Sequence, residues 1–141
     1  LPDDLITAFI EAEEQGARLT REEVIRFCVT LVVAGAETTT YFLGNLLGYL
    51  VESPALFKQL KCERALLRPF MEEAARHTGP VQRLHRVCVQ DTTLGGVPIR
   101  AGEWVAVFFA AANRDPAVFE RPHEFWLQRP NANRHLTFSH G

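Results

Sequence analysis

A carboxylate and a hydroxyl stand side by side at the end of the most apolar stretch of the chain. Glu37 and Thr38 follow residues 27–36, a run dominated by apolar side chains. A carboxylate in such a run is costly to bury unless it faces water or a polar ligand. A threonine in a helix can donate its hydroxyl to the carbonyl four residues earlier, here that of Ala34. The pair predicts an opening in a helix where water or dioxygen can lie. The alternative is a close helix crossing at Gly35, with Glu37 reaching solvent.

Two further charged features could carry chemistry, although each is weak by itself. Glu73 and Arg76 are three residues apart, a spacing that places both on one helical face. Such pairs occur on many solvated helix surfaces, so the spacing alone indicates only an exposed pair. Arg86 is a possible partner for a carboxylate, because a guanidinium offers two parallel donors. Taken alone, it is an ordinary exposed strand residue.

Composition limits the classes of protein to which these residues can belong. The chain has 141 residues, 47% hydrophobic and 23% charged, which is typical of a globular protein and not of a disordered one. A net charge of −2 gives no electrostatic footprint for a nucleic acid. The cysteines Cys28, Cys62 and Cys88 show no CxxC spacing. We therefore expect three small core residues in a reducing, intracellular chain, and neither a disulfide framework nor a zinc site.

The first half of the chain is expected to be helical. A helix from Asp3 to about Gln15 is indicated by its apolar face. Thr20 and Glu23 have the spacing of a capping box, which begins a second helix that runs to about Val51. A membrane span needs about 18 apolar residues without interruption, and Glu37 ends this run sooner. We therefore interpret this long helix as one buried through the centre of a large fold.

The second half is expected to change from helices to strands. Helices are predicted over residues 53–64 and 69–77, each with a proline near its start. Strands are predicted over 81–90, 92–99 and 104–109, with a tight turn at Gly95-Gly96. A short helix is predicted at Asp115-Pro116, followed by an irregular stretch. This order favours a mainly helical α+β architecture with small antiparallel sheets.

Residues 34–39, AGAETT, are where the chain begins to resemble a known family. They resemble the oxygen-binding groove in the central helix of cytochromes P450. The resemblance implies that Thr38 hydrogen-bonds dioxygen and its activated water, and that Glu37 delivers protons towards it. It also implies that Ala34 and Gly35 lie against the haem.

Two more segments resemble the family's structural motifs. Residues 73–76, EAAR, resemble its ExxR motif, in which the ion pair is buried beneath the haem and tied to an arginine from the later meander. Residues 121–125, RPHEF, resemble the meander motif. Glu124 stands where many members carry arginine or histidine. The nearest cationic candidates for the third partner are Arg129 and His123.

The remaining resemblances concern haem and substrate. The strand after Gly79 is similar to one that runs beside the haem, and the resemblance implies that Arg86 pairs with a haem propionate. The loop before it, with Val81, Gln82 and Leu84, would then face the substrate. The chain ends on FSHG, which resembles the opening of the haem-ligand loop Phe-x-x-Gly-x-x-x-Cys and implies a cofactor contact for Phe138. The axial cysteine is expected beyond Gly141, so no metal ligand is predicted within the chain.

The family implies a haem-dependent monooxygenase that activates dioxygen and hydroxylates a small organic substrate. A cytoplasmic enzyme is expected, with a ferredoxin or flavoprotein as electron donor and with neither nucleic acid nor membrane as partner. Residues 1–141 would be a partial domain, without the N-terminal half and the haem-cysteine loop, and inactive in isolation. Two alternatives remain open: a relative that isomerises peroxides, and a truncated, non-catalytic remnant that cannot bind haem.

Overall fold

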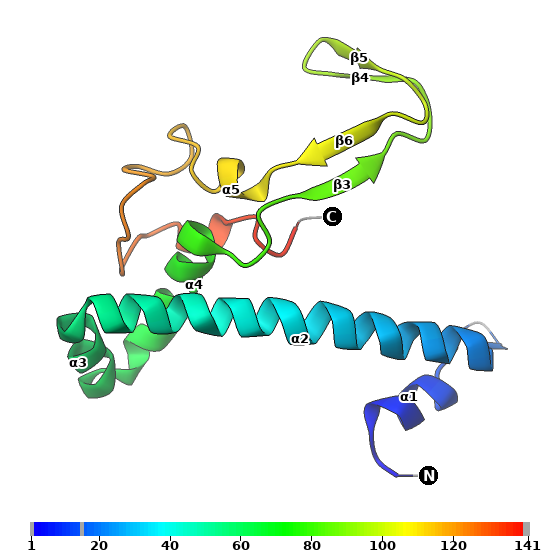
Figure 1. The fold of residues 1–141 in the computed structure, drawn as a ribbon, viewed down its shortest axis with the longest axis horizontal. Coiled ribbons are helices and arrows are strands. Elements are labelled where there is room, and N and C mark those ends of the chain that lie inside the picture. The colour runs from blue at the N-terminus through cyan, green and yellow to red at the C-terminus, as the bar shows by residue number, and fades with distance from the viewer. Residues whose placement is uncertain (1, 15, 140–141) are drawn as a thin grey trace. The chain divides into compact units, whose positions relative to one another are not determined.

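The computed structural model describes residues 2–14 and 16–139, and its chain divides into two compact units (Figure 1). The first unit comprises Leu1–Thr40 and the second Tyr41–Gly141. The long helix α2, Arg21–Glu52, contributes to both units. Each unit is described by itself.

The first unit begins with a short helix and a small hairpin. Helix α1, Leu5–Glu11, is capped by Asp4, whose carboxylate accepts from the Thr7 amide at 2.8 Å. The strands β1, Glu13–Glu14, and β2, Ala17–Arg18, pair antiparallel. The expected helix to about Gln15 was therefore too long, and Gln15 itself lies outside the described residues.

Both ends of α2 agree with the sequence prediction. The Thr20 amide donates to the Glu23 carboxylate at 2.8 Å, and the Glu23 amide donates to Thr20 Oγ1 at 3.3 Å. This is the predicted capping box, which satisfies orphan donors at the helix start. The helix ends at Glu52, and Ser53 then caps α3, Pro54–Cys62, by accepting from the Leu56 amide.

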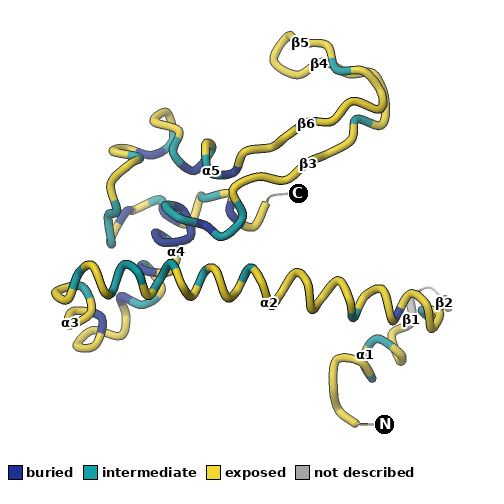
Figure 2. The backbone as a smooth tube through the Cα atoms, viewed as in Figure 1, coloured by how far each residue is buried: buried dark blue, intermediate teal, exposed yellow. Residues whose placement is uncertain are grey.

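The N-terminal part of α2 is largely exposed (Figure 2). Within residues 21–40 only Val24 is buried, while apolar side chains such as Val32 and Val33 are 66% and 62% exposed. By length and hydropathy the helix could cross a membrane, and none of its most apolar window is buried in this chain. The expectation of a buried central helix is thus not met by the residues described. Burial of this helix requires packing partners that these residues do not supply.

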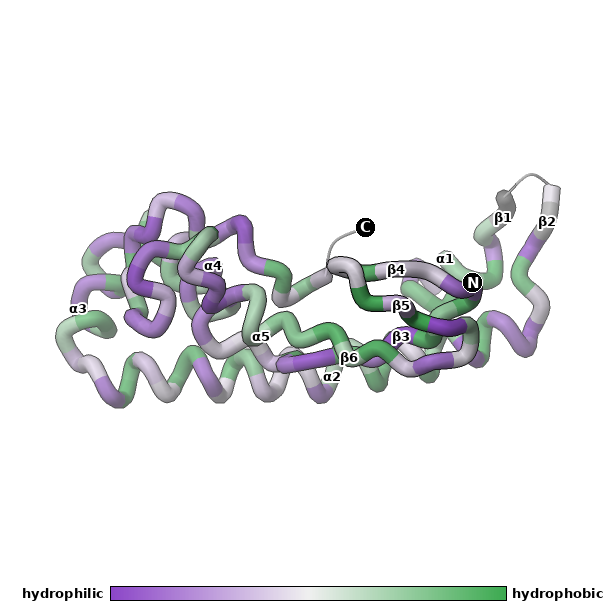
Figure 3. The backbone as a smooth tube through the Cα atoms, turned by 90° about the horizontal axis from the view of Figure 1, so that it is seen from above, coloured by the Kyte–Doolittle hydropathy of each residue, from purple (hydrophilic) through white to green (hydrophobic). Residues whose placement is uncertain are grey.

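Short helices build the core of the second unit. Helix α3 is followed by the 3-10 turn η1, Arg64–Leu66, and by α4, Leu67–Thr78. Hydrophobic residues recur between hydrophilic ones along α3 and α4 (Figure 3). This pattern places Leu60, Leu66 and Phe70 in one buried cluster, against which Tyr49 and Phe125 pack. The core therefore fixes the end of α2 against α4 and the later irregular segment.

Two small antiparallel sheets follow α4. Strand β3, Leu84–Val87, pairs with β6, Trp104–Val107, while β4, Thr92–Leu94, and β5, Val97–Ile99, form a hairpin. The hairpin turns at Gly95 and Gly96, whose φ angles of 57° and 83° suit glycine. The strands are shorter than predicted, and the third is followed by the helix α5, Phe109–Ala112.

Irregular structure follows α5, as predicted, with two departures. Asp115 accepts from the Ala117 amide at 2.9 Å, but the residues after it form turns instead of the expected helix. A 3-10 turn, η2, covers Ala132–Arg134. Apart from these details, the mainly helical architecture with small antiparallel sheets is as the sequence indicated.

Candidate functional site

The most buried charges of the second unit form one ion-pair network around Glu73. Arg76 donates from Nε and Nη2 to the two carboxylate oxygens of Glu73, both at 2.8 Å. Arg129 donates from Nε to the same two oxygens, at 3.1 and 3.0 Å. The Trp126 amide adds a further bond, at 2.9 Å to Glu73 Oε1. All three charged side chains are at most 1% exposed, so the network is a buried structure and not a surface pair.

The network is stable because every donor of Arg76 has an acceptor. Besides its two bonds to Glu73, the guanidinium donates to the carbonyls of Asn113 and Pro122 at 2.8 Å, and to that of Glu124 at 3.1 Å. Buried charges are tolerated only when paired and hydrogen-bonded in this way. The carbonyls belong to the irregular segment, so Arg76 ties that segment to α4.

Arg129 is the third partner that the sequence left open. It also donates to the carbonyls of Glu120, Arg121 and Glu124. His123, the other candidate, is exposed, and only its carbonyl takes part in a described contact, with His77. The Glu124 carboxylate lies at the surface, 3.2 Å from Arg121. A carboxylate at position 124 therefore does not break the network, because only its backbone oxygen is used.

The network also lowers the pKa of the Glu73 carboxylate. Burial raises the pKa of Glu73, but hydrogen bonds from Arg76, the Trp126 amide and Arg129 outweigh burial and hold that pKa below the ordinary 4.5. A lowered folded-state pKa means that this contribution to stability is present above about pH 4.5 and is lost as the pH falls through the folded value. Glu73 is therefore a structural anion at neutral pH.

The residues expected to meet a cofactor or substrate in the second unit lie apart from this network. Arg86 is exposed on β3 opposite Val105, and its guanidinium bonds only to the His85 carbonyl in the described contacts, at 3.1 Å. Phe138 is 75% exposed, and its ring lies 5.6 Å from that of His135.

The expected substrate-facing loop joins α4 to β3. Val81 is half-buried, whereas Gln82 and Leu84 are exposed. The Gln82 side chain donates to the Gly79 carbonyl at 2.7 Å, and the backbone carbonyl of Gln82 accepts from the Ala110 amide at 3.2 Å. The second bond holds the backbone of the loop against α5, and the first lies within the loop. Leu84, which was expected in the loop, is the first residue of β3, and its side chain is exposed.

The Glu37–Thr38 pair lies in the first unit, on α2. Thr38 Oγ1 donates to the Ala34 carbonyl at 2.5 Å, which is the back-bond expected from the sequence. An added methyl group at Gly35 would meet no atom within 4 Å. Glu37 is exposed, so the described residues do not bury its carboxylate. The helix thus offers an open face beside an oriented hydroxyl.

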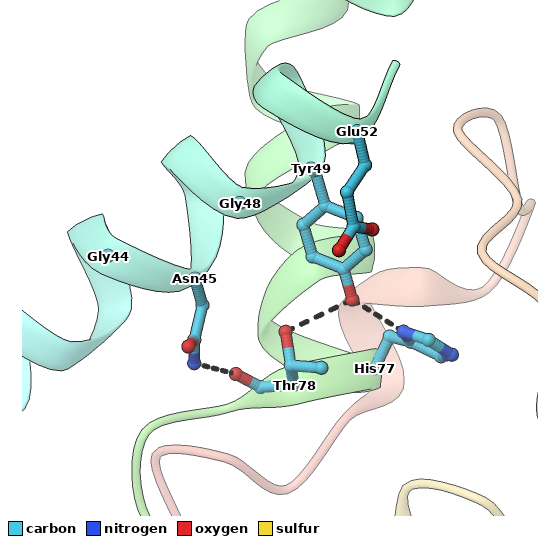
Figure 4. A pocket seen from close by; sticks show the side chains of 7 residues that line it. All are labelled: Gly44, Asn45, Gly48, Tyr49, Glu52, His77 and Thr78. Carbon is cyan, nitrogen blue, oxygen red and sulfur yellow. Dashed lines mark hydrogen bonds between the residues drawn. The ribbon is translucent and has the colours of Figure 1, made fainter.

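A polar cluster that sequence patterns did not reveal lines a pocket of about 330 Å³ between α2 and α4 (Figure 4). Tyr49 Oη lies 2.5 Å from His77 Nδ1 and 3.0 Å from Thr78 Oγ1, and Asn45 donates to the Thr78 carbonyl at 2.6 Å. His77 Nε2 donates to the carbonyl of His123 at 3.0 Å. Because a carbonyl can only accept, the proton of neutral His77 resides on Nε2.

This cluster predicts a pH-dependent stability. Burial is the main cause that lowers the pKa of His77 below 6.5, with Arg114 and Arg76 adding to it and the His123 carbonyl and Glu73 opposing it. The unfolded chain then binds the proton more readily, so stability should fall as the pH drops below about 6.5. Urea unfolding of the complete protein at about pH 7.5 and about pH 5.5 measures this.

The matched variant is His77→Gln, which cannot titrate. His135 also has a pKa lowered chiefly by burial, so wild type and variant share that background. The variant should lose part of the wild type's decrease in stability between the two pH values. An undiminished decrease would show that His77 is not its source.

The structure brings together some of the predicted residues and not others. Glu73 and Arg76 meet in the buried network, whereas Arg86 and Phe138 make no described contact with it or with each other. Within residues 2–14 and 16–139, no group of three or more His, Cys, Asp or Glu side chains could hold a metal ion. Arg129 was one of the two cations that the sequence offered as the third partner, because it lies near the RPHEF segment. Asn113 and Tyr49 had no sequence signal of this kind.

Comparison with known protein families gives one consistent result. A family model described as Cytochrome P450 matches residues 2–141. Among curated proteins, the chain is 42% identical over 138 residues to the putative cytochrome P450 YjiB of Bacillus subtilis. This alignment covers 98% of this chain and 35% of that protein. The chain spans about a third of the length of the curated relatives that it matches.

Solved structures agree with these relatives. The chain superposes on CYP109E1 from Bacillus megaterium in complex with testosterone with a TM-score of 0.93 and 41% identity, covering 99% of this chain and 39% of that one. It superposes on P450BioI in complex with an acyl carrier protein carrying hexadec-9Z-enoic acid with a TM-score of 0.90 and 36% identity, covering 99% and 35%.

Proposed function

The chain belongs to the cytochrome P450 family, as its motifs indicated, and from this premise we propose that it forms part of a haem-dependent monooxygenase. The complete enzyme would activate dioxygen and hydroxylate a small organic substrate. The observation that carries this proposal is the Glu37–Thr38 pair, with the Thr38 hydroxyl oriented by its bond to Ala34. A family member that only rearranges peroxides would not need such a pair.

Proteins of this family bind haem, and the residues present suit that group. The exposed Arg86 guanidinium can pair with a propionate. The exposed ring of Phe138 can pack against a macrocycle. Among the described residues, no atom outside the helix's own backbone lies within 4 Å of an added methyl group at Gly35, which leaves room for a flat ligand beside Ala34 and Gly35. We assign these four residues to haem binding. When bound there, haem would supply the activation of dioxygen.

The protein's own contribution is the control of protons and water. Because Thr38 donates its hydroxyl proton to Ala34, its oxygen keeps lone pairs that can accept a hydrogen bond from a water molecule. The neighbouring Glu37 carboxylate is exposed and can exchange protons with solvent. We assign proton delivery to Glu37 and the orientation of water to Thr38. These are the roles of a general acid relay.

Val81, Gln82 and Leu84 would face the substrate, and a ferredoxin or flavoprotein would supply the electrons in the cytoplasm. Glu73 and Arg76 serve structure, not chemistry, because Arg76 has all its donors engaged. Residues 1–141 alone would be an inactive part of one cytochrome P450 domain, since they span about a third of the relatives' length.

Recovering the complete reading frame that contains this chain tests the proposal. The whole protein is expressed, reduced and treated with carbon monoxide, and we expect the strongly red-shifted Soret band of thiolate-ligated haem. Its absence would reject a haem-thiolate enzyme and leave a non-catalytic remnant. If the band forms but peroxide is rearranged without any reductase, the peroxide-isomerising class replaces the monooxygenase.

A further inference from the structure

Two buried polar side chains hold the segment that leads to Phe138. Asn113 and Thr137 are 2% and 4% exposed. Thr137 Oγ1 donates to the Ala75 carbonyl at 2.6 Å and accepts from Asn113 Nδ2 at 2.9 Å. Asn113 Oδ1 accepts from the Leu136 amide at 2.7 Å. The hydroxyl thus donates its single proton to α4 and accepts with one of its two lone pairs from Asn113, so these two bonds together determine its orientation.

The methyl group of Thr137 is held as tightly as its hydroxyl. Gly79 follows α4, and an added Cβ there would lie 2.6 Å from Thr137 Cγ2 and 2.7 Å from the Ala75 carbonyl oxygen. Any side chain at position 79 would displace Thr137. The chain therefore places a glycine where α4 ends and lets the threonine occupy the space, which fixes Thr137 relative to α4 sterically as well as by hydrogen bonds.

The hydrogen bonds of Asn113 and Thr137 are continuous with the buried ion-pair network. The Asn113 carbonyl accepts from Arg76 Nη1 at 2.8 Å. On the other side of the segment, the Thr137 amide lies 3.2 Å from His135 Nδ1, and His135 Nε2 lies 3.3 Å from the Glu72 carboxylate. Two consecutive residues of α4 thus act at different places. Glu73 belongs to the buried network, and Glu72 contacts His135 in the segment that leads to Phe138.

We propose that Asn113 and Thr137 are positioning residues that hold the haem-ligand segment beginning at Phe138 in register with α4. The inference rests on the proposed function, because it takes the residues after Phe138 to include the axial thiolate. A metal ligand must be held within about 0.5 Å of its productive place by supporting groups. Asn113 supplies this support through its side chain, and Thr137 through its hydroxyl.

The test uses the complete, haem-loaded protein and two variants at one position. Thr137→Val keeps the side-chain volume but leaves Asn113 Nδ2 and the Ala75 carbonyl without their partner, whereas Thr137→Ser keeps the hydroxyl. We measure the fraction of the reduced, carbon monoxide-treated haem that shows the red-shifted Soret band. That fraction should fall severalfold in Thr137→Val and stay near the wild-type value in Thr137→Ser.

A destabilised control separates positioning from a general loss of stability. Leu60→Ala removes a buried side chain of the α3–α4 core that makes no described contact with residues 136–139. It should lower Tm while leaving the spectrum unchanged. The proposal is overturned if Thr137→Val keeps the wild-type band, or if Leu60→Ala loses the band in proportion to its Tm.

A second measurement does not depend on haem. Hydrogen exchange of the Leu136 and Thr137 amides in the complete protein should accelerate in Asn113→Leu and in Thr137→Val, but not in Thr137→Ser. Unchanged exchange in the first two variants would reject the proposal that Asn113 and Thr137 hold this segment. If the wild type shows no thiolate band, the proposed function fails, and the exchange rates still decide whether these residues hold the segment.

Discussion

Replacing Glu73 by glutamine is expected to lower the free energy of unfolding by about 3–5 kcal/mol. The amide has nearly the shape of the carboxylate but no charge, and it presents hydrogen-bond donors to the guanidinium groups of Arg76 and Arg129, which bond to Glu73 at 2.8–3.1 Å. Two buried cations would then lack their anion. Because whole proteins are stable by only about 5–15 kcal/mol, the variant should unfold at a much lower urea concentration.

Glu124→Gln is the matched control for this substitution. The Glu124 side chain is 61% exposed and pairs only with Arg121 in the described contacts, and exposed pairs of this kind contribute about 0–1 kcal/mol. Urea unfolding of the complete protein should therefore show a large loss for Glu73→Gln and a small one for Glu124→Gln. Similar losses in the two variants would mean that the buried network is not the main support of this region.

Replacing Thr38 by alanine in the complete enzyme is expected to divert electrons from product into hydrogen peroxide. The Thr38 hydroxyl is oriented by its 2.5 Å bond to Ala34, so alanine removes the group that would hold a proton-donating water. Positioned proton transfer contributes at least roughly a hundredfold to a reaction rate. Product formation should fall by about that factor while oxidation of the electron donor continues. The measurement is peroxide released and product formed per donor oxidised, with a substrate that the wild type converts.

The same helix offers a matched control for Thr38. Thr40 donates to the Ala36 carbonyl at 2.7 Å, so Thr40→Ala removes an equivalent back-bond without touching the Glu37–Thr38 pair's hydroxyl. It should leave the ratio of product to peroxide unchanged, and Thr38→Ser should largely retain it. Unchanged coupling in Thr38→Ala, or an equal loss in Thr40→Ala, would remove the role assigned to Thr38.

Local interactions explain which features could be predicted from sequence. The capping box at Thr20 and Glu23 and the Ser53 cap involve residues three positions apart, so their types alone predict where α2 begins and α3 starts. The back-bond of Thr38 spans four residues of one helix and is equally local. The Gly95-Gly96 turn follows from the positive φ angles that glycine tolerates. The motifs were also sufficient to identify the family.

Tertiary packing decided the partners that lie far apart in the chain. Arg129 meets Glu73 across 56 residues of sequence, through an irregular segment whose course has no periodicity. Sequence alone could name Arg129 and His123 as nearest cations but could not choose between them. Tyr49 with His77, β3 with β6, and Asn113 with Thr137 are likewise long-range pairs. Such contacts depend on how distant parts of the chain pack together, whereas caps and turns depend only on residues that are neighbours in sequence.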